Sequence, residues 1–437
     1  MELKVKNIGC IESAELSLNG LTVIAGENGS GKSTLSKMIF SIIKAVANIA
    51  QENESAQNVL LEKYSKALYQ RLSLRRLTMS DDAAKLFPNI AVIFAHRIAA
   101  MQGTDMLTEY LANVRQYIQD CTDYFPRVKL LALKDVDSIE ALMSQTDAAQ
   151  QLGSEIRFFV ESEFMNQITT DGTTYSHVSF SWGNGKGNGV IFDIKNDEMN
   201  IIECSMEDAL EDATYIESPL YMPLLDSLRR ASTYIENMKS TILQPMVPLH
   251  VKDIINKYDL LSHYKQDNEV SKLLKTISNI MQGKFVYDDA KRLIYFRDDS
   301  GLRLMPINVA SGVKAFGLLQ ILLQIGAIGP NKPLLWDEPE NHLHPEWQIK
   351  FAEMLVLLSK MGMPIVISTH SPYFIQSIRY YASKYGMSSF VNYYFTEKKK
   401  GNLVNVVETT DNLNYVFAKL AQPLSYVMNI PNKENEK

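Results

Sequence analysis

The sequence predicts an α/β protein whose parallel sheet is assembled from both ends of the chain, with an inserted helical subdomain and antiparallel β elements. Three observations predict this fold. An apolar strand over residues 21–25 leads into a glycine-rich loop and then a helix. Two further apolar runs, residues 333–336 and 364–367, each end in polar side chains. Before them, residues 51–170 have helical spacing of apolar residues and few glycines.

Composition excludes several classes of protein. The 437 residues are 46% apolar and 22% charged, as in globular proteins, and not as in disordered or fibrous ones. With 44 basic and 50 acidic residues the net charge is −6, so nucleic acid binding would need a local patch and no membrane partner is expected. Cys10, Cys121 and Cys204 are far apart and odd in number, which favours a reducing compartment. No secretory signal or membrane-spanning run is recognisable, so we expect a cytoplasmic location.

The chain divides into five expected segments. The glycine loop over residues 183–189 joins two alternating runs, so its glycines indicate a hairpin turn rather than a phosphate site. The segments are residues 1–50 (strands, glycine loop and a helix from about Lys32), 51–170 (helical insertion), 171–221 (β-rich), 222–282 (helical block) and 283–437 (the C-terminal part of the sheet domain).

A phosphate-binding loop is the strongest local signal. The pattern G-x-x-x-x-G-K-S begins at Gly26, after the buried strand and before the helix. Glycines let backbone amides turn toward phosphates, and the helix N-terminus adds partial positive charge. Lys32 would reach the β- and γ-phosphates of a nucleotide, and the Ser33 hydroxyl would ligate Mg²⁺. The loop predicts nucleotide binding.

Residues 333–340, PLLWDEPE, form an apolar strand that ends in two adjacent carboxylates, as a Walker B strand does. Asp337 would hold Mg²⁺ through water, and Glu338 would polarise the attacking water as general base. The competing interpretation is a strand that enters a solvated acidic turn, which the phosphate loop makes less favourable. One helix and one strand further on, residues 364–369 deliver His370 to the same edge of the sheet, so we expect it beside Glu338.

The order of the motifs resembles the ABC-type ATPases of the SMC, RecF and OLD group. It comprises the phosphate loop, a long insertion, Ser311-Gly312 at the start of an apolar helix, DEPE, HLHP and STHSP. Ser311-Gly312 alone would be an ordinary helix cap, but it precedes Asp337 where those ATPases carry their signature motif. Within that group, the stretches IMQGKFVYDDAKRLIYF, LLWDEPENHLHPEWQ, VISTHSPYF and NYVFAKLAQPLSYV resemble AAA ATPases of abortive-infection systems, including the PARIS and Septu ATPase subunits.

The resemblance implies an ABC-type P-loop ATPase head that uses ATP and Mg²⁺. Catalysis would fall to Glu338, His370 and Lys32, and metal binding to Ser33 and Asp337. Ser311 and Gly312 would contact the nucleotide of a second copy in an ATP-dependent homodimer or higher oligomer. The remaining ATP-binding residues would be those of the loop: Gly26, Asn28, Gly29, Ser30, Gly31, Lys32, Ser33 and Thr34.

Several assignments stay open. The second glycine of transporter-type signatures is Val313 here, which leaves the contacts to γ-phosphate undefined. Arg97 in VIFAHR and Glu217 in TYIESP both follow apparent strands, and either could mark the Q-loop. His342 and His344 resemble the D-loop of OLD-type ATPases, and two histidines without a nearby cysteine make only half a structural zinc site.

The function that we expect is ATP hydrolysis that controls a separate effector protein, such as a nuclease, in bacterial antiviral defence. This role follows from the resemblance. The alternatives are a DNA repair or recombination ATPase of the RecF or SMC type, and a self-contained abortive-infection toxin. The chain lacks sustained heptads for SMC arms, and only a short segment follows Pro372, where a fused OLD nuclease would lie.

Overall fold

The computed structural model divides the chain into two compact units. One comprises residues 1–47 and 153–437, and the other residues 48–152. The residues described are 1–72, 86–88, 91–101, 105–120, 126–144, 148–164, 168–183, 188–195, 198–205, 210–225, 227–228, 248–260, 270–288, 293–297, 299–399 and 403–428.

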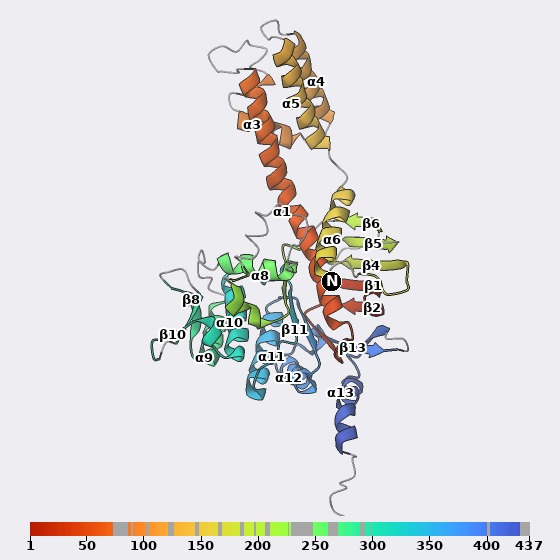
Figure 1. Ribbon diagram of the computed structural model, residues 1–437, viewed down its shortest axis with the longest axis vertical. Helices are drawn as coiled ribbons and strands as arrows, with labels where there is room; N and C mark the ends of the chain where they lie inside the picture. The colour runs from red at the N-terminus through yellow and green to blue at the C-terminus, as the bar shows by residue number, and fades with distance from the viewer. Residues whose placement is uncertain are drawn as a thin grey trace, which may run out of the picture. The chain divides into compact units, whose positions relative to one another are not determined.

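The larger unit contains, among the described residues, an eleven-stranded sheet in the order β6-β5-β4-β1-β2-β14-β13-β3-β12-β11-β7 (Figure 1). Its strands are β1 (Glu2–Ile8), β2 (Ile11–Ser17), β3 (Leu21–Gly26), β4 (Tyr175–Ser181), β5 (Gly189–Lys195), β6 (Glu198–Ser205), β7 (Thr214–Ile216), β11 (Leu334–Asp337), β12 (Ile365–Thr369), β13 (Val391–Lys398) and β14 (Val404–Glu408).

The sheet has a parallel part and an antiparallel part, and the burial of each follows from its sequence. β13, β3, β12, β11 and β7 are parallel neighbours, and every residue of β3, β11 and β12 is buried. Continuous apolar runs suit strands that are covered on both faces. β1, β2 and β4 alternate between apolar and polar residues and pair antiparallel, with one face buried.

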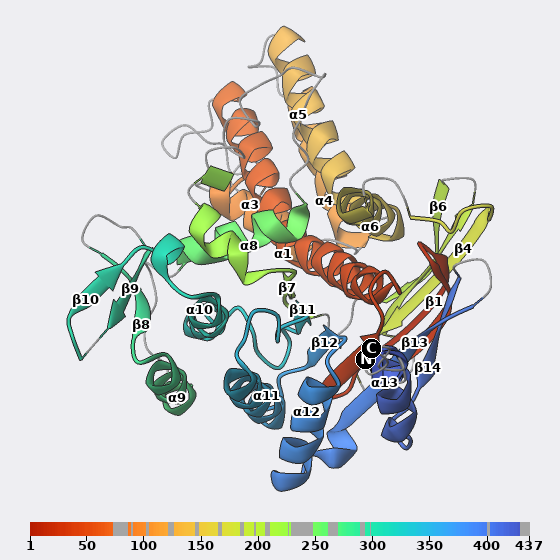
Figure 2. The same cartoon turned by 60° about the horizontal axis from the view of Figure 1, so that its bottom comes forward.

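Helices cover the parallel strands. Figure 2 shows β11 and β12 between α1 on one side and α11 and α12 on the other. The helices and short 3-10 turns of this unit are the first part of α1 (Lys32–Arg71), most of α6 (Ala148–Phe164), η1 (Pro219–Leu224), α8 (Leu249–Leu260), α9 (Ser271–Met281), η3 (Pro306–Asn308), α10 (Ser311–Gln324), α11 (Pro345–Lys360), α12 (Pro372–Lys384), η4 (Ser388–Phe390) and α13 (Leu413–Met428).

A second sheet lies beside α10 and has three strands among the described residues. β8 (Lys284–Tyr287), β9 (Leu293–Arg297) and β10 (Leu302–Leu304) pair antiparallel. The Gln320 side chain of α10 bonds both the backbone N–H and the C=O of Phe285, at 3.0 and 3.2 Å, which fixes the helix against β8.

The smaller unit, residues 48–152, is helical and has its own apolar core. Its helices are the rest of α1, α3 (Ala91–Ala100), α4 (Asp105–Asp120), α5 (Pro126–Ser144) and the start of α6. Phe87 and Phe94 stack at 5.7 Å between ring centroids, with Tyr69 edge-on to both. Leu111, Val114 and Ile118 of α4 are fully buried in the same core.

The predicted α/β fold with a helical insertion and antiparallel β elements is confirmed. Two local expectations need correction. The helix that begins at Lys32 continues to Arg71, well beyond the expected boundary near residue 50. VIFAHR is part of helix α3 and not a strand, so Arg97 does not follow a strand. Cys121 and the C-terminal residues 429–437 lie outside the described residues. No helix in the described part of the chain is long and apolar enough to span a bilayer.

Candidate nucleotide-binding site

The predicted site residues other than Ser311 and Gly312 meet at the C-terminal edge of the parallel strands. Asp337 at the end of β11 is in register with Ser368 of β12, and Thr369 is in register with Ala25 of β3. The glycine loop follows β3, and His370 follows β12. Parallel strands place their carboxyl ends together, which explains why segments more than 300 residues apart in sequence form one site.

Backbone geometry explains three glycines of the loop. Gly29 and Gly31 have φ values of 69° and 81°, a region that side chains disfavour. A Cβ on Gly31 would lie 2.9 Å from Cys10 Sγ, and one on Gly26 would lie 1.7 Å from Thr396 Oγ1. The loop thus packs closely on β2 and β13 before α1 begins at Lys32, so its amides and the helix N-terminus face the same pocket.

Ser30 contributes to the loop through its hydroxyl group, which is buried. It donates to Glu27 O at 2.7 Å and lies 2.5 Å from Thr396 Oγ1. Thr396 also donates to Ala25 O at 3.2 Å. Thr396 therefore braces the phosphate loop from β13, a role with no signal in the sequence because a threonine in a strand is unremarkable.

Lys32 is 5% exposed, and its ammonium lies within the loop. It donates to Gly26 O at 3.0 Å and to Glu27 O at 2.8 Å, and it lies 3.8 Å from Glu338 Oε1. Burial lowers the pKa of Lys32, and the nearby carboxylates, Glu338 foremost, oppose that shift. The geometry presents a buried cation to whatever occupies the pocket.

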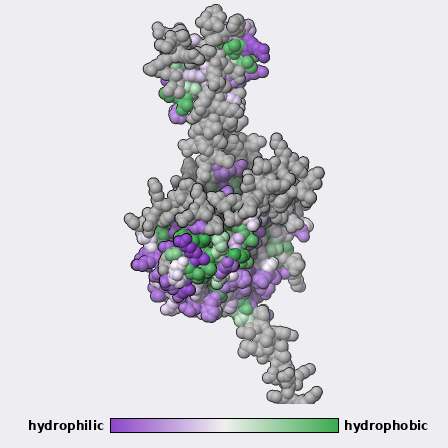
Figure 3. All heavy atoms as spheres, turned by 60° about the vertical axis from the view of Figure 1, so that its left-hand side comes forward, coloured by the Kyte–Doolittle hydropathy of each residue, from purple (hydrophilic) through white to green (hydrophobic). Residues whose placement is uncertain are grey.

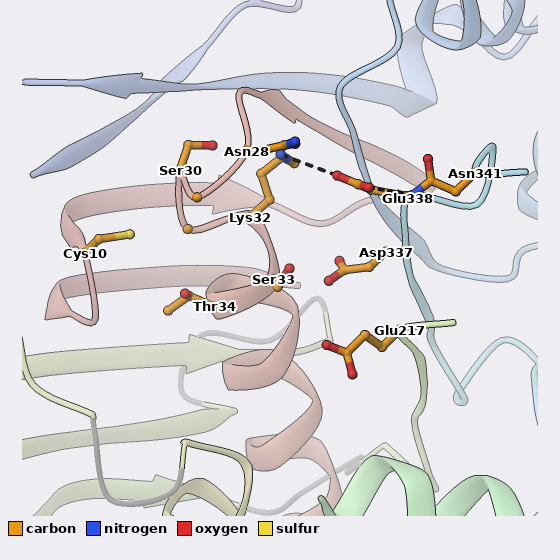
Figure 4. A pocket seen from close by; sticks show the side chains of 12 residues that line it. Cys10, Asn28, Ser30, Lys32, Ser33, Thr34, Glu217, Asp337, Glu338 and Asn341 are labelled. Atoms are coloured by element: carbon orange, nitrogen blue, oxygen red, sulfur yellow. Dashed lines mark hydrogen bonds and ion pairs between the residues drawn. The ribbon is translucent and has the colours of Figure 1, made fainter. Parts of the chain in front are cut away.

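A pocket of about 490 Å³ opens between the loop and the ends of β7 and β11 (Figure 4). The Ser33 hydroxyl and the Asp337 carboxylate point toward one another across it. Asp337 is 6% exposed and accepts hydrogen bonds from Tyr215 at 2.8 Å and Ser368 at 2.6 Å, so its orientation is fixed. The lining residues are Cys10, Asn28, Gly29, Ser30, Gly31, Lys32, Ser33, Thr34, Glu217, Asp337, Glu338 and Asn341.

Glu338 has a strained backbone and three polar neighbours. Its φ is 46°, which is unusual for a residue with a side chain, and its N–H donates to Ser368 O at 3.0 Å. Asn341 Nδ2 donates to Glu338 Oε2 at 2.6 Å, and His370 Nδ1 lies 3.1 Å from Oε1. His370 therefore lies beside Glu338, as the sequence spacing predicts. Asn341 is a neighbour that sequence reasoning missed.

Ser311 and Gly312 lie elsewhere in the larger unit. α10 begins at Ser311, and neither residue is among those that line the pocket in the described part of the chain. A Cβ on Gly312 would lie 2.9 Å from the Trp347 ring and 3.2 Å from Leu343 Cδ2. Glycine at this position lets the first turn of α10 pack against the loop that follows β11.

Glu217 directly follows β7 and lines the pocket, whereas Arg97 belongs to the helical unit. Hydrogen bonding from His250 lowers the pKa of Glu217 to about 2, against the opposing effect of burial. Of the two positions proposed for the Q-loop, only Glu217 is in this pocket.

The two histidines after β11 differ in local structure. His342 has a φ of 63°, and His344 caps α11, with its ring accepting from Glu346 N at 3.4 Å. Within the described residues, no group of three or more His, Cys, Asp or Glu side chains is arranged to hold a metal ion.

Comparison with known proteins places these features in context. A family model described as "AAA ATPase domain" matches residues 1–375. No curated protein matches the sequence.

Solved structures of SMC heads are similar to the chain at low identity. An SMC head bound to the C-terminal winged-helix domain of ScpA has 10% identity and a TM-score of 0.41, with 93% of this chain and 96% of that chain covered. The SMC head of Thermotoga maritima has 11% identity and a TM-score of 0.35, over 93% and 97%. A head from Pyrococcus furiosus with an extended coiled coil, bound to the C-terminal domain of ScpA, has 9% identity and a TM-score of 0.39, over 98% of each chain.

Proposed function

The chain belongs to the AAA ATPase domain family, and from this membership we propose that it binds ATP with Mg²⁺ in the described pocket and hydrolyses ATP to ADP and phosphate. One observation carries the proposal. Lys32 of the phosphate loop, Asp337 and Glu338 converge on one pocket although they come from opposite ends of the chain. This arrangement supports positioning and charge stabilisation, which are the main requirements of phosphoryl transfer.

The triphosphate would lie along the loop from Gly26 to Thr34. Backbone amides and the N-terminus of α1 would receive the phosphate oxygens, and Lys32 would stabilise negative charge on the β- and γ-phosphates. Because Lys32 is almost fully buried, its charge acts through protein rather than bulk water, which strengthens the interaction.

The residues present fit Mg²⁺. A hydroxyl from Ser33 and a carboxylate from Asp337 are the oxygen donors that this ion prefers, and the remaining positions suit water and phosphate oxygens. When bound, Mg²⁺ would neutralise charge on the β- and γ-phosphates. Tyr215 and Ser368 hold the Asp337 carboxylate in the orientation required for this.

Glu338 would act as the general base. It would take a proton from water while the water oxygen attacks the γ-phosphorus and the bond to the β–γ bridging oxygen breaks. Asn341 fixes one carboxylate oxygen of Glu338, and His370 faces the other. His370 would orient Glu338, and the distance of 3.1 Å between His370 Nδ1 and Glu338 Oε1 supports this role.

Two substitutions test this assignment because one should remove ATP binding and the other should remove only ATP turnover. Lys32→Ala should abolish ATP binding, since it removes the cation of the loop. Glu338→Gln should retain ATP binding and lose turnover by about two to four orders of magnitude, since an amide cannot accept the proton. Binding of a fluorescent ATP analogue and phosphate release would be measured on the same preparations. Hydrolysis by Glu338→Gln at the unmodified rate would refute the role of this residue.

The second part of the proposal is an ATP-dependent dimer in which Ser311 and Gly312 of one copy contact the nucleotide of the other. Met305 and Ile307, just before Ser311, are 38% and 64% exposed, and Leu302 is 43% exposed. Figure 3 brings the left-hand side of Figure 1 forward, where β8 and β10 lie, and shows apolar side chains among polar ones on that face. Exposed apolar groups next to Ser311 support a contact that forms on closure of the dimer.

The third part is the biological role, which rests on the resemblance to abortive-infection ATPases. We propose that ATP hydrolysis controls a separate effector, such as a nuclease, in antiviral defence. The test incubates the purified chain with DNA and RNA, Mg²⁺ and ATP, first alone and then with the product of the neighbouring gene. Cleavage that requires the second protein and an intact Glu338 supports control of an effector. Cleavage by the chain alone, lost on substitution outside the ATP site, would favour a self-contained toxin.

A further inference from the structure

The His250 side chain, at the start of α8, is fully buried between two carboxylates. Its ring Nδ1 lies 2.8 Å from Glu163 Oε2, and its backbone N–H donates to Glu163 Oε1 at 2.7 Å. Both side chains of this pair have 0% exposure. Burial of such a pair is costly unless every polar atom has a partner, and it rarely improves stability over apolar packing. The arrangement therefore calls for a role beyond packing.

The third partner of this cluster reaches the ATP pocket. His250 Nε2 lies 3.2 Å from Glu217 Oε2, and Tyr221 donates to the same oxygen at 2.7 Å. The side chain of Glu217 is 42% exposed and lines the pocket on the side of Ser33 and Asp337 (Figure 4). The contacts of Oε2 with His250 and Tyr221 fix the orientation of the Glu217 carboxylate at the pocket.

A second contact joins His250 to β7, the strand that Glu217 follows. The Tyr215 ring packs on the His250 ring at 4.8 Å between centroids, while the Tyr215 hydroxyl donates to Asp337. Tyr215 belongs to β7, and Glu217 directly follows it. His250 therefore contacts both Glu217 and the residue that bonds Asp337, and these two carboxylates line the pocket.

α8 holds β7 at both ends. At the other end of the helix, Lys257 donates to Ala213 O and Thr214 Oγ1, both at 2.7 Å, and bonds Asp253 at the same distance. Asp253 also bonds Lys44 of α1 at 2.8 Å. β7 is only three residues long and pairs with one neighbour, β11, at the edge of the sheet, so these contacts add to the pairing in holding its position.

We propose that His250 is a positioning residue for ATP hydrolysis, which holds Glu217 in the pocket through Nε2 while Glu163 of α6 anchors the opposite side of its ring. The inference rests on the proposed ATPase function and adds to it a residue that does not touch the nucleotide. Glu217, so fixed, gives the pocket an oriented hydrogen-bond acceptor for water beside Ser33 and Asp337. Because Glu163 lies at the end of α6 and bonds His250, the position of the Glu217 carboxylate then depends on the end of α6.

Two amide substitutions separate positioning from simple packing. The amide nitrogen of asparagine corresponds to Nδ1 and can reach Glu163, whereas that of glutamine corresponds to Nε2 and can reach Glu217. His250→Asn should lower kcat about tenfold to a hundredfold with little change in the KM for ATP. His250→Gln should recover most of the lost kcat. A purely structural role predicts equal kcat for both, in step with their thermal unfolding midpoints.

A double-substitution cycle keeps the proposal testable if either amide variant is unstable. If His250 acts through Glu217, His250→Asn combined with Glu217→Ala should lose no more kcat than Glu217→Ala alone. Additive losses would overturn the proposal, as would full kcat in His250→Asn. The matched control is Tyr258→Phe, on the same helix. It removes a buried hydroxyl that has no hydrogen-bond partner in the described part of the chain, so it should keep kcat and midpoint. If the unmodified protein hydrolyses ATP and Glu338→Gln does not, additive losses or full kcat in His250→Asn would refute the role of His250 alone. An unmodified protein without ATPase activity would refute both proposals.

Discussion

Glu338 and Glu340 are two residues apart and have opposite environments. The side chain of Glu338 is 26% exposed in the pocket, whereas Glu340 is 3% exposed behind it. Thr369 donates to Glu340 Oε1, and Oε2 is buried with no hydrogen-bond partner among the described residues. Desolvation raises the pKa of Glu340, which the hydrogen bond from Thr369 only partly opposes. Of the two glutamates in the DEPE sequence, one therefore lines the pocket and the other is costly to ionise.

Glu340→Gln should stabilise the protein at neutral pH. The folded-state pKa of Glu340 lies above its unfolded value, so the folded protein favours the protonated form of this side chain. The stability that this gives is fully present below the unfolded pKa and is lost as pH rises through the folded pKa. Each unit of that upward shift costs about 1.4 kcal/mol at high pH. A neutral glutamine avoids the cost and can still accept from Thr369. The unfolding midpoint of the variant should exceed that of the unmodified protein at pH 8, with a smaller difference at pH 5.

The control for this comparison is Glu346→Gln, at an exposed glutamate of α11. The pKa of Glu346 is lowered by its bond to Lys350, so this substitution should give no gain at pH 8. A lower midpoint for Glu340→Gln than for the unmodified protein at pH 8 would contradict the argument and would indicate that the ionised form is needed for folding.

Residues within continuous motifs could be predicted from the sequence, whereas their supports could not. Lys32, Asp337 and His370 follow apolar strands, and that context identifies them. Thr396 and His250 contact the site across long sequence separations, and no local pattern distinguishes them from ordinary strand or helix residues. Sequence reasoning finds groups that perform chemistry more readily than groups that hold them.

Among the elements, the contact of α10 with β8 depends on a missing side chain. A Cβ on Gly317 would lie 2.2 Å from Cε2 of the Phe285 ring, which is itself fully buried. Gln320, one turn further along α10, then bonds the backbone of Phe285 on both sides. The helix that begins with Ser311 is thus positioned by β8.

Gly317→Ala should destabilise the larger unit by about 1–3 kcal/mol, because overpacking forces the helix or the ring to move. Thermal unfolding would measure the loss. Gly329→Ala is the matched control and should leave the midpoint almost unchanged, because no heavy atom of the described residues lies within 4 Å of the added carbon. An unchanged midpoint for Gly317→Ala would contradict this prediction and would show that the Phe285 ring can move without loss of stability.

The sequence predicted the parallel strands β3, β11 and β12 correctly, but it did not distinguish every short apolar run as strand or helix. β3, β11 and β12 are short, continuous apolar runs between polar segments, which is typical of parallel strands. VIFAHR has the same appearance, and a short apolar run cannot by itself distinguish a strand from a buried helix. The order of the strands was not predictable, because partners such as β3 and β13 are remote in sequence.

For the molecule as a whole, dimerisation is the property to test. In the Glu338→Gln background, which should trap bound ATP, sedimentation should change from monomer to dimer when ATP is added. Adding Ser311→Arg should prevent this change without loss of ATP binding, because the large side chain would obstruct the contact that forms on closure. Ser383→Arg, at an exposed serine of α12, is the control and should dimerise normally. Hydrolysis by a monomer at all protein concentrations would refute the dimer model.

The pairing of β3 also has a consequence for the order in which the protein is made on the ribosome. β3 is complete after residue 26, yet its two neighbours are β12 and β13, which end at residues 369 and 398. The helical unit, residues 48–152, is continuous in the chain and can fold as soon as it emerges. The loop that follows β3 gains its contact with Thr396 only after β13 has been synthesised. A chain that is terminated before residue 391 therefore carries the complete loop sequence without the strand that supports it, so we expect such a chain to bind ATP poorly.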